Sequence, residues 1–319
     1  MPTFGGKTLG RIRRLNRRKR VRAPVLLLLA GTLLPTVAAS EDGPGAGSEY
    51  EPEYESAITR RLELESRLND NPFSITPYKP TYLLPLAYSS DRPVNAEGDE
   101  LDQLEMKFQV SLKVPISNNL FGTGTQFAFG YTQVAYWQAY NSNYSSPFRE
   151  TNHEPELMLV HPHRATLGRI TSRVFRLGVS HQSNGRSGRE SRSWNRVYVD
   201  FMMESGDWYL SLKPWWRIPE SEKQDPDDPS GDDNPDIHRY MGNFEFSGLY
   251  YQGARTYGFM VRNNLRSDNR GALQLDGTFP IGDQMRGYAQ LFSGYGESLI
   301  DYDRYSNRFS LGVMLTNWL

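Results

Sequence analysis

The sequence predicts an all-β fold, an antiparallel transmembrane β-barrel, and three observations lead to this fold class. Several runs of residues alternate between apolar and polar side chains with a period of two. The polar positions of these runs hold charged residues, which can face a watery lumen. Aromatic residues make up 13% of the chain, while the mean hydropathy of −0.63 is too low for a bundle of apolar membrane helices.

The clearest run lies between residues 104 and 116. Its apolar members occupy every second position: Leu104, Met106, Phe108, Val110, Leu112, Val114 and Ile116. A helix cannot produce this period, but a half-buried strand of a soluble β-sandwich can. Similar alternation recurs at 127–137, 175–180, 196–203, 208–213 and 309–319. The charged residues in these runs favour a barrel, because a sandwich core would leave them unpaired. Counting runs gives ten to twelve strands, and the even number expected of such barrels favours twelve.

The first 39 residues are predicted to be an export signal peptide. Nine Lys or Arg residues precede or border the apolar stretch 25–34, and the small residues Val37-Ala38-Ala39 follow it. Removing 1–39 takes away nine of the 36 cations and none of the 37 anions, which leaves a net charge of −10. Such an acidic chain is a poor nucleic-acid binder, so no nucleic-acid partner is expected. The lack of cysteine excludes disulfides and thiolate metal sites.

Residues 40–100 are predicted to form an N-terminal lead-in, partly extended or disordered, with a short charged helix over 55–69. The barrel domain is predicted to occupy residues 101–319. Its longest turn-rich segments are 141–156 and the acidic 219–236, whereas other connections are tight. Long loops at one end of the strands and short turns at the other are typical of outer-membrane barrels.

Three polar residues share the apolar, outward parity of two consecutive runs. His181 and Ser183 continue the parity of Phe175, Leu177 and Val179, and Asn195 has the parity of Val197. Polar side chains on a lipid-facing surface cost free energy unless they bond one another. A neutral histidine can take the proton of a serine hydroxyl, and an asparagine oxygen can hold its other ring nitrogen. The pattern predicts an outward Ser-His-Asn triad, although residues at the aqueous rim would give the same spacing.

Four segments together resemble the outer-membrane phospholipase A family: FRETNHEPEL (148–157), HQSNGRSGRESRSWNRVY (181–198), DDNPDI (232–237) and SGYGESLIDYD (293–303). The resemblance extends from about residue 74 to the C-terminus. It implies a twelve-stranded barrel in the outer membrane of a Gram-negative-type cell, surrounded by membrane phospholipids that are also its substrate. It also implies calcium-dependent hydrolysis of sn-1 and sn-2 acyl esters of phospholipids and lysophospholipids by a homodimer. By the same resemblance, His181, Ser183 and Asn195 match the catalytic residues of the family.

The resemblance further implies a calcium site that two subunits share. The carbonyl oxygens of Arg186 and Ser145 from one subunit and the Ser191 hydroxyl from the other match the ligands of the family. Such hard oxygen donors suit calcium. The backbone N–H of Gly185 is expected to help stabilise the oxyanion, together with the ion and its bound water.

Two more residues are expected to act outside the triad. Asp233 matches a residue linked in the family to a second, monomer-state calcium site, but the loop 219–233 is longer and more acidic here. Gln133 has the outward parity of Phe129 and Tyr131, where an unpaired amide would cost about 2–7 kcal/mol. A position above the lipid band would explain Gln133 equally well, whereas the family uses the matching glutamine at its dimer interface. The resemblance therefore favours a dimer contact.

The competing prediction is a barrel without enzymatic activity, a pore or scaffold in which the His-Ser pair is incidental. A pore would concentrate its polar residues on the inward face. The shared outward parity of His181, Ser183 and Asn195 therefore favours the hydrolase.

Overall fold

The computed structural model describes residues 56–68, 74–94, 99–225, 227–228, 230–282 and 285–317. The predicted signal peptide, and the lead-in as far as residue 55, lie outside the described residues. Helix α1 (Ala57–Leu68) comes first, followed by the two-residue strand β1 (Thr76–Pro77) and then by long strands. No helix in the described ranges is long and apolar enough to cross a membrane.

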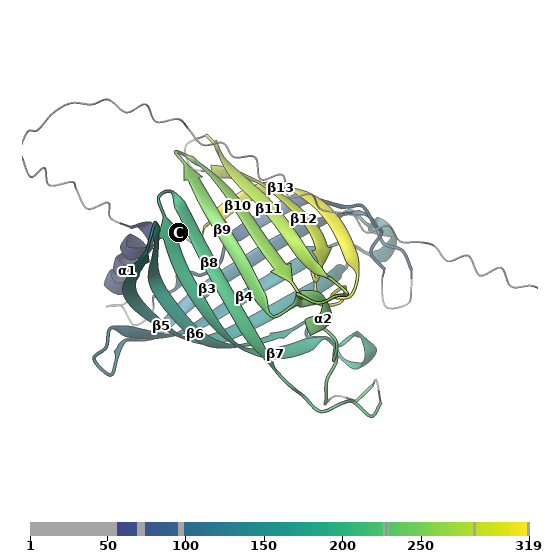
Figure 1. The fold of residues 1–319 in the computed structure, drawn as a ribbon. Coiled ribbons are helices and arrows are strands. Elements are labelled where there is room, and N and C mark those ends of the chain that lie inside the picture. Colours follow the sequence, from purple (N-terminus) through teal and green to yellow (C-terminus); the bar gives the residue numbers. More distant parts are fainter. Residues whose placement is uncertain are drawn as a thin grey trace, which may run out of the picture. The chain divides into compact units, whose positions relative to one another are not determined.

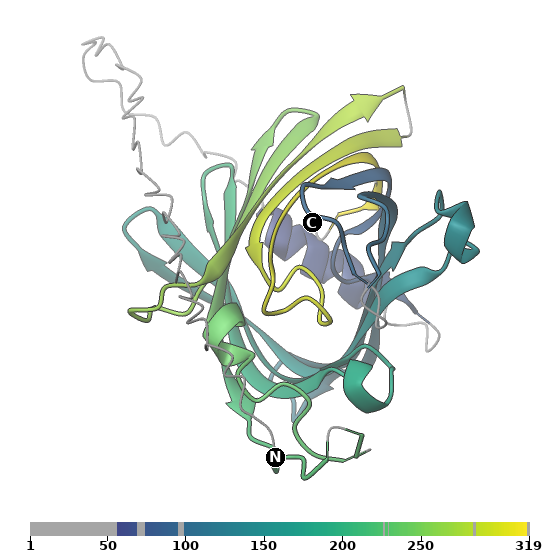
Figure 2. The same ribbon diagram turned by 90° about the vertical axis from the view of Figure 1, so that its right-hand side faces the viewer.

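Twelve long strands close into one antiparallel barrel, seen from the side in Figure 1 and turned by 90° in Figure 2. Each strand pairs with its neighbours in sequence, and β13 pairs with β2 to close the ring. The strands are β2 (Thr81–Ser89), β3 (Leu104–Leu120), β4 (Thr125–Trp137), β5 (Phe148–Leu167), β6 (Ile170–Ser183), β7 (Ser193–Ser205), β8 (Trp208–Ile218), β9 (Phe244–Gln252), β10 (Arg255–Asn263), β11 (Gly271–Ile281), β12 (Met285–Tyr295) and β13 (Tyr305–Thr316). Closure pairs both edges of every strand, as an apolar surrounding requires. The predicted fold class and strand number are confirmed.

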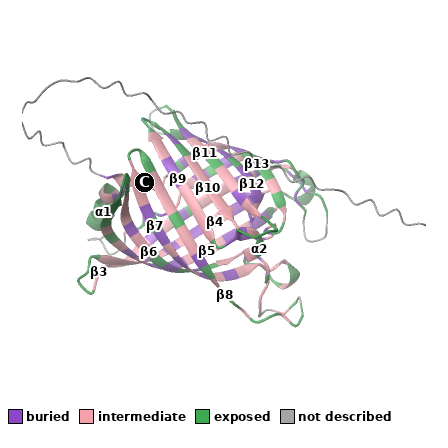
Figure 3. Cartoon of the chain, in the orientation of Figure 1, coloured by how far each residue is buried: buried purple, intermediate pink, exposed green. Residues whose placement is uncertain are grey.

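The strands alternate between a polar inner face and an apolar outer face, and Figure 3 shows buried positions alternating with intermediate or exposed ones along them. On β3, Glu105 and Lys107 are buried, whereas Val110 and Ile116 are exposed. Buried charges pair with one another on the inner face, as Arg149 Nη2 of β5 does with Glu105 Oε1 of β3 at 3.0 Å. A charge inside a protein is stable only when it is paired, so the ion pairs explain how charged residues fill the interior.

The barrel begins earlier than residue 101, the predicted boundary. β2 lies within the predicted lead-in, yet it pairs with β13 and β3 and completes the ring. A bulge between Leu84 and Ala87 shifts its register, so that both side chains are fully buried although they are three residues apart. The bulge breaks the period of two, and Pro85 is a residue that central strands rarely hold. The predicted boundary was therefore wrong.

The segment 141–156 is not one long connection, as its polar composition indicated. β5 begins at Phe148, so that only residues 138–147 join it to β4. Glu154 and Glu156 belong to the inner face of β5, where Lys79 Nζ lies 2.7 Å from one carboxylate and 2.8 Å from the other. The polar residues that resembled a loop are thus the lumen side of a strand.

The two ends of the barrel differ in their connections. Turns of two to four residues join β3 to β4, β5 to β6, β7 to β8, β9 to β10 and β11 to β12. Longer loops lie at the other end, among them 184–192 after β6 and 219–243 after β8, which contains the short helix α2 (His238–Met241). The predicted triad lies at the end with the long loops, because Ser183 is the last residue of β6.

Helix α1 lies at the end of the barrel with the short turns (Figure 1). Ser56 bonds Glu204 beside the β7–β8 turn. Ile58 is only 2% exposed and packs against lumen-facing side chains of the strands. Buried Glu65 forms an ion pair with Lys113 of β3. The predicted short helix is present, and it is part of the barrel interior rather than a separate lead-in.

Candidate active site

His181 and Asn195 lie side by side on the outer face of the barrel. β6 and β7 pair antiparallel so that the two residues stand opposite each other. The His181 Nδ1 and Asn195 Oδ1 atoms are 2.9 Å apart. Leu177 and Val179 on the same face of β6 are 39% and 46% exposed, so the predicted outward parity is present in the structure. Each polar side chain satisfies the other on a surface that is otherwise apolar.

Ser183 shares the outward face of β6 with His181, two residues earlier. It stands opposite His153 of β5 on one side and Ser193 of β7 on the other. In the described part of the chain, no hydrogen bond joins the Ser183 hydroxyl to another side chain. Ser183 therefore lies on the same face as a histidine whose Nδ1 is held by Asn195.

The loop after Ser183 is held in place by the buried side chain of Asn184. Its Oδ1 accepts hydrogen bonds from the backbone N–H groups of Arg186 at 3.3 Å and Arg192 at 3.0 Å. Gly185 lies between them with φ +67°, a left-handed conformation that favours glycine. The Gly185 N–H that the sequence predicted at the oxyanion therefore belongs to a fixed loop next to the serine.

Two residues predicted at calcium sites, Ser191 and Asp233, are in direct contact. Ser191 Oγ donates to Asp233 Oδ2 at 2.7 Å, and Ser193 Oγ donates to the same oxygen at 3.0 Å. Lys223 forms an ion pair with the other carboxylate oxygen. Burial tends to raise the pKa of Asp233, but these hydrogen bonds and the Lys223 ammonium lower it below the ordinary aspartate value. The carboxylate is therefore ionised.

The other predicted calcium residues, Ser145 and Arg186, lie in separate loops at the same end of the barrel. Ser145 is exposed, with φ 56°, and ends the short helical turn Ser142–Tyr144. The Arg186 guanidinium bonds the Arg149 carbonyl oxygen, which fixes the adjacent backbone. Within the described ranges, no group of three or more His, Asp or Glu side chains is placed to hold a metal ion. The donors here are hydroxyl, carbonyl and Asp233 oxygens, and this hard donor set fits calcium.

Gln133 lies on the outer face of β4, beside the triad. Its Oε1 accepts a hydrogen bond of 3.3 Å from the Tyr131 hydroxyl, which lies 2.7 Å from His153 Nδ1. The amide expected to be unpaired therefore has one partner within the chain. The register continues from Gln133 to His153 and from His153 to Ser183. A Cβ at Gly185 would lie 3.8 Å from the His153 ring, so this ring lies between Tyr131 and the loop that contains Gly185.

Two residues of the site were missed by the sequence analysis. His153 shares the outward parity of Leu157 and could have been found once 148–167 was recognised as a strand. Glu220 accepts a hydrogen bond of 2.9 Å from Asn195 Nδ2. It lies in the acidic loop after β8, and no periodic pattern in that loop indicates which carboxylate returns to the barrel wall.

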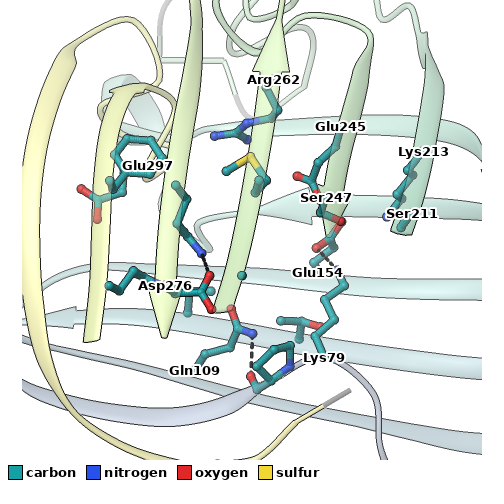
Figure 4. A pocket seen from close by; sticks show the side chains of 18 of the residues that line it. Lys79, Gln109, Glu154, Ser211, Lys213, Glu245, Ser247, Arg262, Asp276 and Glu297 are labelled. Atoms are coloured by element: carbon teal, nitrogen blue, oxygen red, sulfur yellow. Dashed lines mark hydrogen bonds and ion pairs between the residues drawn. The ribbon is translucent and has the colours of Figure 1, made fainter. Parts of the chain in front are cut away.

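A separate polar cavity of about 370 Å³ lies inside the barrel. Figure 4 shows charged side chains that line it from strands and from the connections between them: Lys79, Glu154, Lys213, Glu245, Arg262, Asp276 and Glu297. None of His181, Ser183 and Asn195 lines this cavity. The charged lumen and the candidate active site therefore occupy opposite faces of the same wall.

Comparisons with known proteins give one consistent result. A family model described as Phospholipase A1 matches residues 58–315. Phospholipase A1 of Salmonella typhimurium is 36% identical over 304 residues, which cover 93% of this chain and 99% of that protein. The structure of outer membrane phospholipase A from Escherichia coli matches with a TM-score of 0.71 and 38% identity, covering 78% of this chain and 95% of that one. The calcium-bound dimer of the Salmonella typhi outer membrane phospholipase matches with a TM-score of 0.70 and 36% identity, covering 78% and 94%.

Proposed function

The chain belongs to the phospholipase A1 family, and we propose that it is an outer-membrane enzyme that hydrolyses acyl esters of phospholipids and lysophospholipids. One observation carries the assignment of the site: the 2.9 Å hydrogen bond between His181 Nδ1 and Asn195 Oδ1, beside Ser183 on the apolar outer face. A passive barrel gains nothing from three polar groups at that position, whereas a hydrolase needs them there.

In the proposed reaction, Ser183 Oγ attacks the ester carbonyl carbon while His181 Nε2 accepts the serine proton. Asn195 accepts the Nδ1–H bond and holds the ring in the tautomer that can act as a base. The Gly185 N–H stabilises the negative oxygen of the tetrahedral intermediate. The ester bond breaks as His181 returns the proton to the leaving alcohol. Water then attacks the acyl-serine with His181 again as base, which releases the fatty acid and restores the Ser183 hydroxyl.

The substrate reaches the triad from the side. Exposed apolar residues surround the site, among them Leu177, Val179 and Trp216, which is 71% exposed. A phospholipid in the surrounding leaflet can lie against these side chains without entering the lumen. Its two ester groups lie at nearly the same depth, so we assign cleavage of both the sn-1 and the sn-2 ester to the same site.

Calcium is the proposed cofactor, since the homologous Salmonella typhi dimer holds bound calcium and the oxygen donors here fit it. The Ser191 hydroxyl of one subunit and the Arg186 and Ser145 carbonyl oxygens of the other would hold the ion. When bound, it supplies positive charge that favours the negative oxygen of the intermediate. Asp233 would serve a second site in the monomer, where the Lys223 ammonium now pairs with one of its oxygens.

The active species is proposed to be a homodimer. The homologous Salmonella typhi structure is a dimer, and the proposed ligand set needs two subunits. Tyr131 bonds only the oxygen of the Gln133 amide. The N–H groups of the Gln133 amide can therefore bond Gln133 of a second subunit across a two-fold axis. We also propose that residues 1–39 are a signal peptide, which N-terminal sequencing of the mature protein would test.

The triad is tested by ester release from phospholipid micelles with Ser183→Ala. Turnover should fall to background, because no other hydroxyl replaces the nucleophile. Ser180→Ala is the matched control, since Ser180 lies on the same strand and faces the lumen, and its buried hydroxyl has no hydrogen-bond partner among the residues that the structure describes. Wild-type turnover in Ser183→Ala would refute the triad, and product analysis with separately labelled acyl chains tests the two-ester assignment.

Calcium and dimerisation are tested in the same assay. A chelator should abolish turnover of the wild-type protein, and unchanged turnover would refute the cofactor. Crosslinking should increase when calcium and a substrate analogue are added, and Gln133→Ala should weaken it. Gln126→Ala, on the same strand but with the opposite parity, should leave crosslinking unchanged. Equal crosslinking of the Gln133→Ala variant and wild type would count against the interface.

A further inference from the structure

Asn195 has a second partner that a three-residue triad does not require. Its Nδ2 donates a hydrogen bond of 2.9 Å to Glu220 Oε1, while its Oδ1 lies 2.9 Å from His181 Nδ1. β8 pairs with β7 so that Ile218 stands opposite Asn195. Glu220 follows Ile218 by two residues and so continues the outward side of β8 at the rim. The asparagine amide is therefore bonded at both ends, to an imidazole and to a carboxylate.

We propose that Glu220 is a positioning residue that fixes the orientation of the Asn195 amide and, through it, the tautomer of His181. This inference rests on the proposed hydrolase function. An ionised carboxylate only accepts hydrogen bonds, so Asn195 must turn its N–H2 toward Glu220 and its oxygen toward His181. That oxygen also only accepts, so His181 must carry its proton on Nδ1 and keep the lone pair on Nε2.

Without the carboxylate, the reversed amide would be equally satisfied. Its N–H2 would then donate to Nδ1 of His181 and place the imidazole proton on Nε2, where no base remains for Ser183. Glu220 excludes this arrangement because it offers no hydrogen to the amide oxygen. The two oxygens of an aspartate carboxylate are equivalent, so its orientation does not matter. The two ends of an asparagine amide differ, and the contact with Glu220 selects the orientation that suits His181.

The charge of Glu220 adds an electrostatic effect. When His181 takes the serine proton it becomes an imidazolium, and a negative charge beyond Asn195 stabilises that cation. The position of the carboxylate also avoids a cost. A charged group at residue 195 would face the apolar surround directly, whereas Glu220 lies beyond the end of β8 at the water-facing rim.

The cations nearest in sequence to Glu220 are already paired with other residues. Arg217 pairs with Asp232, and Lys223 pairs with Asp233. In the ranges that the structure describes, Glu220 itself forms no ion pair. Its carboxylate is therefore not neutralised by a cation and accepts the hydrogen bond from Asn195.

The loop 219–233 holds Glu220 in register with the triad. The backbone N–H of Asp232 donates to the Ser221 carbonyl oxygen at 2.7 Å, which closes the base of the loop immediately after Glu220. Asp233 then ties the loop to Ser191 in the β6–β7 connection. The acidic loop therefore docks one carboxylate on Asn195 and another on the loop that follows the nucleophile.

Glu220→Gln is the first test, with Glu222→Gln as its control. Glutamine can accept or donate at this position, so it no longer selects one orientation of the Asn195 amide. In the calcium-containing micelle assay, kcat should fall by about 10–100-fold. This is the loss typically seen when the residue that orients a metal-binding histidine is removed, and Glu220 acts on His181 in a similar indirect way. KM and the calcium concentration for half-activation should stay unchanged. Glu222 is exposed in the same loop and its removal should have no effect.

The pH profile separates positioning and charge from a merely structural role. The acidic limb of the kcat/KM profile reports the ionisation of the base in the free enzyme. Loss of the Glu220 carboxylate should move this limb to lower pH, because the His181 imidazolium is then less stabilised. Glu220→Asp retains the charge and should recover part of kcat. Imidazole ¹⁵N shifts of His181 provide a readout independent of turnover: a proton on Nδ1 in wild type, and a mixture of both tautomers in Glu220→Gln.

A reversal of sign is expected in the Asn195→Asp background. There the new carboxylate would face Glu220 with like charge, so Glu220→Gln should raise activity instead of lowering it. A purely structural residue would lower activity in both backgrounds. Wild-type kcat, pH profile and ¹⁵N shifts in Glu220→Gln would overturn the inference, and so would equal losses in both backgrounds. If Ser183→Ala keeps its activity, the proposed function fails, whereas the ¹⁵N measurement still decides on Glu220.

Discussion

On the outer surface of the barrel, several polar residues of β4, β5, β6 and β7 lie next to one another. Gln133 accepts a bond from Tyr131, Tyr131 meets His153, and His153 stands opposite Ser183. His181 and Asn195 stand opposite each other on the next strand pair. An isolated polar group in an apolar surround would cost several kcal/mol, but the hydrogen bonds within the Gln133–Tyr131–His153 group and the His181–Asn195 pair reduce that cost.

The close packing behind the site leads to a prediction about Gly178, which lies on the lumen side of β6. A Cβ there would overlap the Tyr198 ring, with Cε1 only 2.7 Å away. Tyr198 is 1% exposed and lies under the Lys213 ammonium, which is 4.0 Å from its ring centre. Gly178→Ala should therefore lower the free energy of unfolding by about 1–3 kcal/mol in urea titrations.

Gly277→Ala is the matched control for that experiment. Gly277 is also a strand glycine, but a Cβ there would meet nothing closer than the Thr256 carbonyl oxygen at 3.5 Å. Its variant should unfold at nearly the wild-type urea concentration. If both alanine variants shift equally, the overlap with Tyr198 is not the cause.

Among the elements, α1 shows how a short helix is held in a barrel mouth. An isolated helix of 12 residues is marginal in water, so α1 depends on its contacts with the strands. Glu65 is its buried anion, and it pairs with Lys113, whose side chain is 6% exposed. Glu65→Ala would leave that cation buried without this partner, at a cost of about 3–5 kcal/mol.

The expected result of Glu65→Ala is faster cleavage of α1 by a protease added to refolded protein. Glu63→Ala is the control, because Glu63 lies on the same helix with an exposed side chain. Cleavage of the Glu63 variant should match that of wild type. Equal protection of α1 in all three proteins would show that the ion pair does not hold the helix.

The same ion pair predicts a pH dependence for the docking of α1. Burial tends to raise the pKa of Glu65, but the Lys113 ammonium and the Arg61 guanidinium lower it below 4.5. A lowered pKa means that docking of α1 favours the ionised form of Glu65. The ion pair therefore stabilises docking fully above the ordinary glutamate pKa, and this stabilisation is lost as the pH falls through the pKa of Glu65 in the docked helix. Protection of α1 should be constant from neutral pH to about pH 5.5 and decline below about pH 4. Protection that increases on acidification would contradict this sign.

At the scale of the whole molecule, ion pairs and helix α1 narrow the barrel interior near its two ends. Arg308 of β13 pairs with Glu105 of β3 at 2.9 Å and with Glu297 of the β12–β13 loop at 2.8 Å, near the long loops. Helix α1 covers the end with the short turns. Ion pairs therefore occupy part of the interior, beside the cavity of about 370 Å³.

We expect the protein to give no stable conductance steps when it is inserted into a planar lipid bilayer, because ion pairs and α1 obstruct both ends. A porin inserted in the same bilayer provides the positive control. Persistent ion-conducting steps from the purified chain would support the pore alternative instead.

The sequence predicted the architecture well where the alternation was regular, and poorly where the backbone was not. β3 and β6 could be read by parity, which also indicated the outward direction of His181 and Ser183. β2 escaped detection because its bulge breaks the period, and β5 because its lumen side is so polar. Glu220 could not be predicted, because a contact made by a returning loop depends on tertiary structure and leaves no periodic signal.

The seam between β13 and β2 sets an order of assembly. Arg308 bonds the backbone of Ala87 across 221 residues of sequence, whereas His181 and Asn195 are only 14 residues apart. Contacts between distant parts of a chain form slowly, while neighbouring hairpins form early. The β6–β7 hairpin lies about halfway around the ring from the seam. The hydrogen-bonded pair of His181 and Asn195 thus belongs to a local unit that can form while the ring is still open.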